Sequence, residues 1–307
     1  MAAHQVAGWP PSRQTSGMLN PADRPAPSLK RRLCNLPFWA VHAASLGVWF
    51  VDFQWRWVGL CVFLYGIRMF GITAGYHRYF SHRTYRMNRF WQFWMAWLGA
   101  SSLQMGPLWW AAHHRHHHRY SDTPEDIHSP LQRGFWYSHC FWFLDGHNDQ
   151  TRTELIPDLV RYPELRWLER WHLLPGISLA VGCLAWGGPQ AFFWGFALST
   201  VLLWHGTFTI NSLAHVIGTR RFETTDTSRN HLGLALITLG EGWHNNHHRY
   251  QSSANQGFFW WEIDVSFYVL KLLSLLGIVS KLQKAPLHRL LASTPRPELS
   301  PDISPQT

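Results

Sequence analysis

Nine histidines and one asparagine fall in four short clusters whose spacing could hold transition metals. Neutral imidazole is the commonest transition-metal ligand, and one ion accepts at most about six ligands, so ten candidates indicate two ions in one site. With 20 His in 307 residues, a specified His-x-x-His-His is expected about 0.08 times per chain, yet it occurs twice. The candidate ligands are His77 and His82; His114, His117 and His118; Asn211 and His215; and His244, His247 and His248.

The spacing within each cluster indicates which ligands a regular helix can present together. Residues at i, i+3 and i+4 lie on one face, so each His-x-x-His-His can direct three imidazoles to one place. Asn211 and His215, four residues apart, share a face in the same way. His77 and His82 are five apart, which leaves them roughly 140° apart on a regular helix. They converge only if the helix ends or unwinds between them; alternatively, they serve different ions.

The types of donor narrow the choice of metal. Cys34, Cys61, Cys140 and Cys183 are scattered and form no C-x-x-C pair. This argues against a disulfide framework, a structural zinc site and an iron–sulfur cluster. An open site of imidazole nitrogens with one amide oxygen suits iron that must bind dioxygen.

Four apolar stretches can cross a bilayer if their flanking aromatic residues are included. Short turns at residues 52–57 and 187–189 join them in pairs, so the sequence predicts two helical hairpins. Basic residues precede the first stretch and follow the second and the fourth, which predicts that these ends, and with them every histidine cluster, lie on the cytoplasmic side. The four stretches are residues 36–51, 58–74, 172–186 and 190–213.

Two further apolar runs, residues 90–105 and 265–279, are predicted to be interfacial or re-entrant amphipathic helices. Only 15% of residues are charged, below the globular norm of about 25%. The net charge of +9 fits an anionic lipid surface or a phosphate-bearing substrate. We expect no nucleic-acid partner, because the arginines form no basic stripe. Residues 1–32 and 291–307 are rich in Pro, Ser and Ala and are predicted to be disordered, which leaves one membrane domain at 33–290.

Residues 71–83, 114–123, 211–215 and 240–248 resemble the histidine boxes of the membrane acyl-CoA (delta-9, stearoyl-CoA type) fatty-acid desaturases, and residues 134–139 and 261–264 resemble further landmarks of that family. The resemblance extends from about residue 36 to residue 285. It implies an all-α integral membrane protein with four transmembrane helices in two hairpins and a cytoplasmic helical cap. It also implies a non-haem di-iron centre, with Asn211 contacting one iron through a water and the nine histidines binding iron directly.

The same resemblance implies an oxygen-dependent desaturase that inserts a cis double bond, by the family's habit at delta-9, into a saturated acyl chain, preferably acyl-CoA. The chain has no His-Pro-Gly-Gly haem-binding motif, so a separate ferredoxin, cytochrome b5 or reductase is expected to supply two electrons. The lack of a fused haem domain favours a bacterial cytoplasmic membrane. The alternatives are a membrane di-iron hydroxylase and, in a different class, a membrane metal carrier.

Substrate contacts are harder to predict. Tyr65, Met69 and Thr73 precede His77 by 12, 8 and 4 residues and share its helix face, so they are candidates for the closed end of an acyl tunnel, or simply for helix packing. One group of arginines could contact the phosphates of coenzyme A or of lipid headgroups, or anchor the chain by the positive-inside rule: Arg78, Arg83, Arg86 and Arg89.

The other histidines are predicted to be structural polar groups. His205 is the most doubtful, because a polar group inside a membrane span tends to be functional. His113 and His116 extend the second cluster to an almost continuous run, which leaves its register open on spacing alone. The match of neighbouring residues to the family pattern favours 114, 117 and 118. The histidines predicted to be structural are His42, His139, His147, His172, His205 and His231.

Overall fold

A computed structural model describes residues 33–286, and within them the chain is mostly helical, as predicted. The segments predicted to be disordered, 1–32 and 291–307, lie outside the described residues. Two short strands, β1 (Arg86–Met87) and β2 (Val279–Ser280), pair antiparallel. The α-helices in chain order are α2 (Leu36–Ser45), α3 (Trp55–Phe70), α4 (Arg89–Ala100), α5 (Pro107–Tyr120), α6 (Pro130–Arg133), α7 (Phe135–His139), α8 (Pro157–Val160), α9 (Pro163–Arg170), α10 (Leu174–Ala191), α11 (Ser199–Asn211), α12 (Leu232–Ile237), α13 (His244–Arg249) and α14 (Val265–Leu275).

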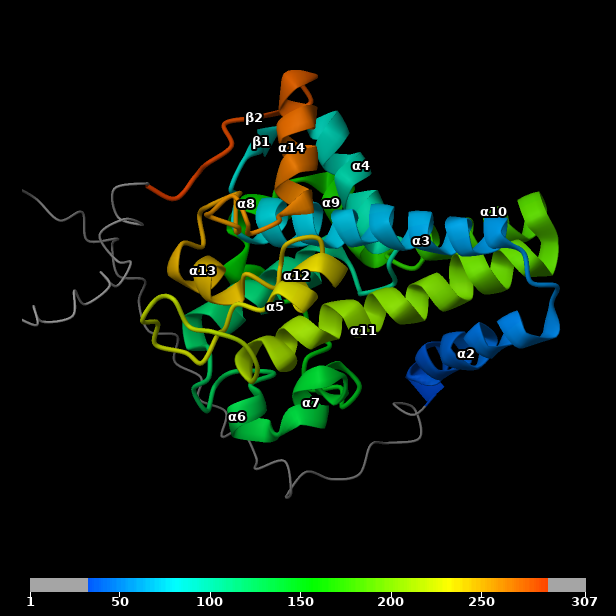
Figure 1. The fold of residues 1–307 in the computed structure, drawn as a ribbon, viewed down its shortest axis with the longest axis horizontal. Helices are drawn as coiled ribbons and strands as arrows, with labels where there is room; N and C mark the ends of the chain where they lie inside the picture. Colours follow the sequence, from blue (N-terminus) through cyan, green and yellow to red (C-terminus); the bar gives the residue numbers. More distant parts are fainter. Residues whose placement is uncertain (1–32, 287–307) are drawn as a thin grey trace, which may run out of the picture.

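Two helical stretches of the described chain are long and apolar enough to cross a membrane, Trp55–Ser81 and Leu174–His215. The first comprises α3 and its continuation; the second comprises α10, a π-helical segment, α11 and a final 3-10 turn. The stretch Leu36–Phe50, which matches the first predicted span, is apolar but shorter. Figure 1 shows α3, α10 and α11 extending to one side of the molecule, away from the smaller helices.

The longer stretch is bent at the predicted turn. Gly187 and Gly188 have non-helical backbone angles, and Gly188 has a φ of +63°, a value that L-residues with a side chain rarely adopt. Pro189 follows and cannot donate a helical hydrogen bond. The 42-residue stretch is therefore two helices that meet at a sharp break, as the Gly-Gly-Pro sequence predicts.

The helix that carries the first pair of candidate ligands changes its hydrogen-bonding pattern before it reaches them. Gly71–Ser81 is a π-helix, and its last bond joins the His82 N–H to the His77 carbonyl, five residues earlier, at 3.2 Å. π-helical turns are rare and occur frequently at functional sites. The helix thus unwinds to a wider turn and ends at Ser81, between His77 and His82, and the two rings converge as such a change permits.

The two predicted amphipathic runs form α4 and α14. Helix α4 buries Met95, Ala96 and Gly99 while Phe90 and Trp94 stay exposed, and it begins at Asn88, whose side chain accepts a hydrogen bond from the Trp91 N–H. Helix α14 likewise exposes one apolar side and buries the other. Both rise at the top of Figure 1, beside β1 and β2.

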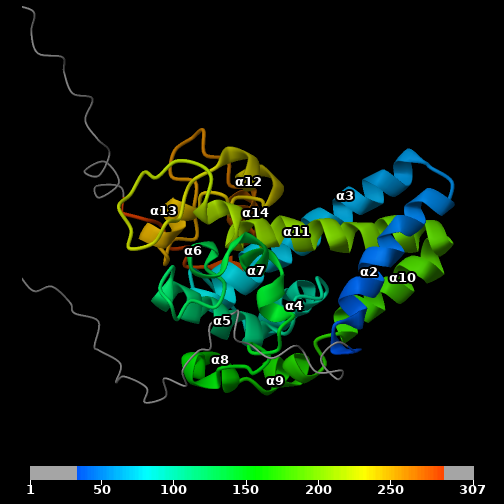
Figure 2. The same cartoon turned by 90° about the horizontal axis from the view of Figure 1, so that it is seen from below.

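Helix α5, which carries the second cluster, packs against the π-helix. Ala111 and Ala112 are fully buried at this contact and permit close approach of the two backbones. Glu169 of α9 accepts hydrogen bonds from the first free N–H groups of α5, those of Leu108 and Trp109, and so stabilises its start. Figure 2 shows α8 and α9 beneath α5, and α13 with α12 in the same compact part of the molecule.

Candidate metal centre

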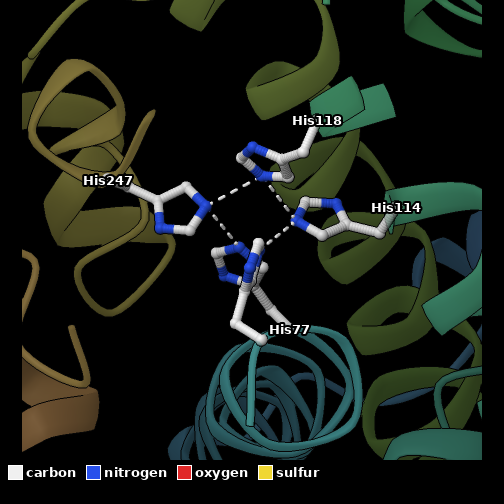
Figure 3. Close-up of side chains that lie close together, drawn as sticks. His77, His114, His118 and His247 are labelled. Atoms are coloured by element: carbon white, nitrogen blue, oxygen red, sulfur yellow. Dashed lines mark hydrogen bonds between the residues drawn. The ribbon is translucent and has the colours of Figure 1, made fainter. Parts of the chain in front are cut away.

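Five histidines converge on one point. His77 and His82 come from the π-helix and its end, His114 and His118 from α5, and His247 from α13, with one ring nitrogen of each within 4.8 Å of all the others. Their Nε2 atoms form close contacts: 3.0 Å from His77 to His247, 2.9 Å from His82 to His114, 3.0 Å from His114 to His118 and 2.9 Å from His118 to His247. Figure 3 shows four of these rings facing a common centre.

A second group lies next to the first and is made of His117, His215, His244 and His248, all buried. The Nε2 atoms of His215 and His244 are 3.2 Å apart. The third box therefore contributes here, and the second and fourth boxes each divide their ligands between the two groups. Together the two groups contain the nine histidines that the sequence predicts as ligands, in sets of five and four.

Buried carboxylates orient four of the nine rings. Each carboxylate accepts a hydrogen bond from the Nδ1–H of its histidine, because an ionised carboxylate can only accept, and this leaves the ring's lone pair on Nε2. The Nδ1 of His77 contacts Glu241; the other pairs are His117 with Asp126 at 3.1 Å, His215 with Asp122 at 3.1 Å and His248 with Asp226 at 2.6 Å. Such carboxylate–histidine pairs fix ring orientation and raise the basicity of metal ligands.

The sequence did not predict these four carboxylates as site residues. Asp122 and Glu241 lie inside the histidine boxes, so their positions in the sequence could have identified them as site residues. Asp126 follows the second box by a few residues, and it also accepts the Asp122 N–H at 2.8 Å. Asp226 lies in a loop far from any box in sequence, and no pattern singles it out.

The charge state of the rings fits a metal site. Burial, followed by neighbouring imidazoles, lowers the pKa of His114, His118, His244 and His247 well below the usual range of histidine. These rings are therefore neutral, each with one nitrogen lone pair. Neutral imidazoles whose Nε2 atoms lie about 3 Å apart can direct their lone pairs at one cation. The Nε2 of His248 is buried with no hydrogen-bond partner, as expected of an unused ligand atom.

Arg78 is buried beside Glu241, the carboxylate that contacts His77. The prediction that Arg78 contacts lipid or coenzyme phosphates is wrong. Its side chain is 1% exposed and contacts Asp264 at 2.9 Å and Glu241 at 3.0 Å, so it is not accessible to a headgroup. Gly240 makes this packing possible: its φ is +124°, and an added Cβ would lie 2.4 Å from an Asp264 oxygen. Glu241 thus connects the arginine to the ring of His77.

A small cavity of about 40 Å³ lies beside both groups of histidines, lined in part by His77, His114 and His244. Met69, Thr73 and Asn211 also line it, whereas Tyr65 does not. Tyr65 instead donates from its hydroxyl to the Ile237 carbonyl at 2.5 Å. Binding sites for small molecules usually measure about 300–1,000 Å³, so an acyl chain enters this space only if the lining side chains move.

Three of the six histidines predicted to be structural contact one another. His42, His205 and His139 form a hydrogen-bonded row with contacts of 3.2 and 3.0 Å, which continues to the Ser212 hydroxyl. His205, the doubtful case inside a span, therefore has partners at both ring nitrogens. Beside this row Ser138, from one predicted landmark, donates to the Asn211 carbonyl at 2.6 Å.

His113 and His116 are absent from the two groups, which supports the predicted register of the second box. His113 contacts the Trp109 carbonyl, and His116 lies between Arg152 at 2.7 Å and the Glu125 carbonyl at 3.0 Å. Helix α5 therefore directs 114, 117 and 118 to the centre and the two other rings away from it.

Replacing Asp226 by Asn should lower the affinity of the second group for metal by about 10–100-fold, the usual cost of losing such a partner. His248 would lose the carboxylate that fixes its hydrogen on Nδ1. The measurement is metal retained by the purified protein against a graded chelator. Glu223→Gln, an exposed position in the same loop, is the matched control. Equal retention by both variants would contradict the role of Asp226.

Comparison with known proteins agrees with this geometry. A model of the fatty acid desaturase family matches residues 53–274. The sn-2 palmitoyl-lipid 9-desaturase of Nostoc sp. (strain 36) is 39% identical over 277 residues, 88% of this chain and 96% of that protein. An acyl-CoA C20 Delta5-desaturase of Anemone leveillei is 37% identical over 75% of each chain. Delta-9 acyl-lipid desaturase 1 of Arabidopsis thaliana is 35% identical over 75% of this chain and 76% of its own.

Proposed function

Since this chain belongs to the fatty acid desaturase family, we propose that it inserts a cis double bond at the delta-9 position of a saturated acyl chain carried by a membrane lipid. The observation that carries the proposal is the convergence of nine neutral or carboxylate-bound histidines on two adjacent points. A lipid-bound substrate replaces the acyl-CoA expected from the sequence. The reason is that the 9-desaturase similar to this chain over 96% of its own length is named for a lipid substrate.

Iron is the metal proposed for both points. His77, His82, His114, His118 and His247 would hold one ion, and His117, His215, His244 and His248 the other, with Asn211 near the second through a water. Two bound irons would supply, with dioxygen, the oxidising power to remove two hydrogens from adjacent methylenes, which no side chain provides. The balance requires two electrons and two protons, and dioxygen leaves as two waters. A separate electron-carrier protein would supply the electrons.

The remaining task of the protein is to position one carbon–carbon bond. Holding a reactant in one orientation decides which bond reacts and contributes much of the rate. Met69 and Thr73 line the cavity beside His77 and would contact the acyl chain. Asn211, which also lines the cavity, would orient the opposite side of that chain. The buried rings and carboxylates exclude bulk water from the reacting carbons.

We also propose the membrane arrangement expected from the sequence. Two hairpins would supply four spans, with the two long apolar stretches as their main members and α2 completing the first hairpin. The nine histidines would then lie at the cytoplasmic ends of the spans, under a cap of the smaller helices, with basic loops on the same side.

The test is to express the chain in a host that lacks delta-9 unsaturation and to determine fatty acids and double-bond positions by mass spectrometry, lipid class by lipid class. A His117→Ala chain is the control. A cis-monoene that forms on intact lipids and disappears in the control supports the proposal. A monoene that forms first on acyl-CoA would overturn the lipid assignment, and a hydroxylated product would identify a hydroxylase. Bound metal without oxygen consumption, in the presence of a reductant, would identify a metal carrier.

Replacing Met69 by Ala should lengthen the preferred acyl chain by about two methylenes, each worth roughly 0.8 kcal/mol of apolar burial. Met69 is 1% exposed and lines the cavity, so its loss extends the closed end. The measurement is the product distribution over substrates of graded length. Tyr65→Phe is the matched control, because Tyr65 lies next to Met69 at Gly206 but does not line the cavity. An unchanged distribution in Met69→Ala would remove this residue from the tunnel.

A further inference from the structure

A second and larger cavity of about 500 Å³ lies where the end of the π-helix, β1, α4 and the α8–α9 turn meet. It shares no lining residue with the cavity beside the histidines. Four arginines line it and no acidic side chain does: Arg83, Arg86, Arg89 and Arg161. Such a lining favours an anion, because a concave basic surface focuses a positive potential.

Two of the four positive charges are not neutralised. Guanidinium nitrogens of Arg83 and Arg89 lie 3.5 and 2.6 Å from carboxylates. Arg86 and Arg161 form no ion pair with any residue in the described part of the chain; Arg161 donates to the hydroxyl of Tyr162 at 2.9 Å and lies over its ring. The cavity therefore keeps a net charge of about +2 for a ligand.

A buried donor faces the same space without a partner. Gln92 is 2% exposed and accepts the Tyr79 hydroxyl at 3.0 Å through Oε1, while its Nε2 has no hydrogen-bond acceptor. The Nη1 of Arg83 is likewise buried and unpaired. Buried donors normally have acceptors, so these two point to a ligand with several acceptor oxygens. A phosphate group has such oxygens and binds arginine in a bidentate manner.

The side chains around the cavity indicate which kind of molecule carries the phosphate group. Phe90, next to Arg89, is 60% exposed, and Leu275 at the end of α14 is 86% exposed. Figure 1 shows α4 and α14, which carry these side chains, close to β1 and β2, and Arg86 of β1 and Arg89 of α4 line the cavity. Exposed apolar side chains that border arginines are typical of a surface at the headgroup level of a bilayer. A free phosphate would also leave most of a 500 Å³ cavity unfilled.

We propose that this arginine cavity binds the phosphate headgroup of an anionic membrane phospholipid, as a ligand distinct from the acyl substrate. The bound lipid holds α4 and α14 at the membrane surface. Gln92 and Arg83 contact the phosphate oxygens from the buried side, while Arg86 and Arg161 contact it from the open side. The binding does not depend on the proposed desaturation, so it can be tested on protein that carries out no reaction.

The test measures the affinity of the purified full chain in detergent for short-chain phosphatidylglycerol, by native mass spectrometry. The Arg86→Gln/Arg161→Gln variant should bind about 30-fold more weakly, since each basic residue near a lipid surface contributes roughly a factor of five. The matched control, Arg166→Gln/Arg170→Gln on α9, has the same net charge but lies outside the lining, and should bind as the parent chain does. Equal affinity in all three chains would overturn the proposal.

The Gln92→Glu variant is a second, independent test of the proposal that removes no arginine. The new carboxylate keeps an acceptor for the Tyr79 hydroxyl and places an internal anion opposite Arg83, so the fold is retained while lipid binding is lost. Thermal melting of each variant checks the fold. Undiminished binding by Gln92→Glu would place the lipid elsewhere. Equal binding of short-chain phosphatidylcholine, or full displacement by inorganic phosphate at the same concentration, would overturn the assignment to an anionic lipid.

Discussion

Replacing His118 by Ala should reduce formation of the unsaturated product more than about a hundredfold. The expectation exceeds the 10–100-fold cost of losing a partner that only orients a ligand. The His118 Nε2 lies 3.0 Å from that of His114 and 2.9 Å from that of His247, so its loss opens one side of the five-histidine group. The measurements are the monoene fraction of total fatty acids and the metal content per chain, which should fall by about one ion.

His116→Gln is the matched control on the same helix. His116 lies two residues earlier, contacts Arg152 and the Glu125 carbonyl, and does not belong to either group. Glutamine can maintain polar contacts there, so product and iron should stay near those of the parent chain. If the two variants lost activity equally, the register of the second box would be wrong. If His118→Ala kept both activity and iron, the five-histidine group would not be a ligand set.

The second large effect is on stability. Replacing Arg78 by Met should lower the free energy of unfolding by about 3–5 kcal/mol, the usual cost of breaking a buried ion pair from one side. Asp264 is fully buried, and burial already raises its pKa above the ordinary range although Arg78 opposes that shift. Without the guanidinium, Asp264 would be a buried carboxylate with no ion pair, whereas Glu241 would keep its contact with His77. Denaturant unfolding in detergent is the measurement, with product formation recorded in parallel.

Two further variants separate this effect from a general loss of charge. Arg78→Met/Asp264→Asn removes the main uncompensated carboxylate and should recover part of the loss. Arg89→Met removes an arginine whose side chain is 66% exposed and pairs with Glu164, so its effect should be much smaller. A destabilisation by Arg78→Met no larger than that of Arg89→Met would show that the buried network contributes little.

The candidate ligands could be predicted from the sequence because metal-binding histidines recur at short, fixed spacings. Such spacings are visible without knowledge of the fold. The break at Gly187 and Gly188 was predictable for a similar reason, since glycine and proline act locally. The division of the second histidine box between the two groups was not predictable. A three-residue or four-residue spacing gives one shared face, yet His117 joins a different group from His114 and His118 because a second set of rings approaches α5 from another side.

Long-range partners also escaped prediction. Asp226 meets His248 across a loop, and Arg78 meets Asp264 across more than half of the chain, so no local pattern reports either pair. Arg78 also shows how a correct local rule can mislead. A basic residue at the end of a membrane span normally stays at the surface, but buried carboxylates from two later segments enclose this one.

The π-helix Gly71–Ser81 joins one wall of the small cavity to the five-histidine group through continuous backbone. One continuous helix carries Met69 at the cavity wall and His77 at the five-histidine group, so the interval between them is a fixed number of helical steps. Each step advances roughly 1.5 Å in the α-helical part, and one turn roughly 5.4 Å. A single residue deleted between Met69 and His77 would shift the cavity wall along and around the helix axis relative to the ligands. Under the proposed function, side chains changed at successive turns of this helix would alter the accepted acyl length in steps while the ligands remain in place.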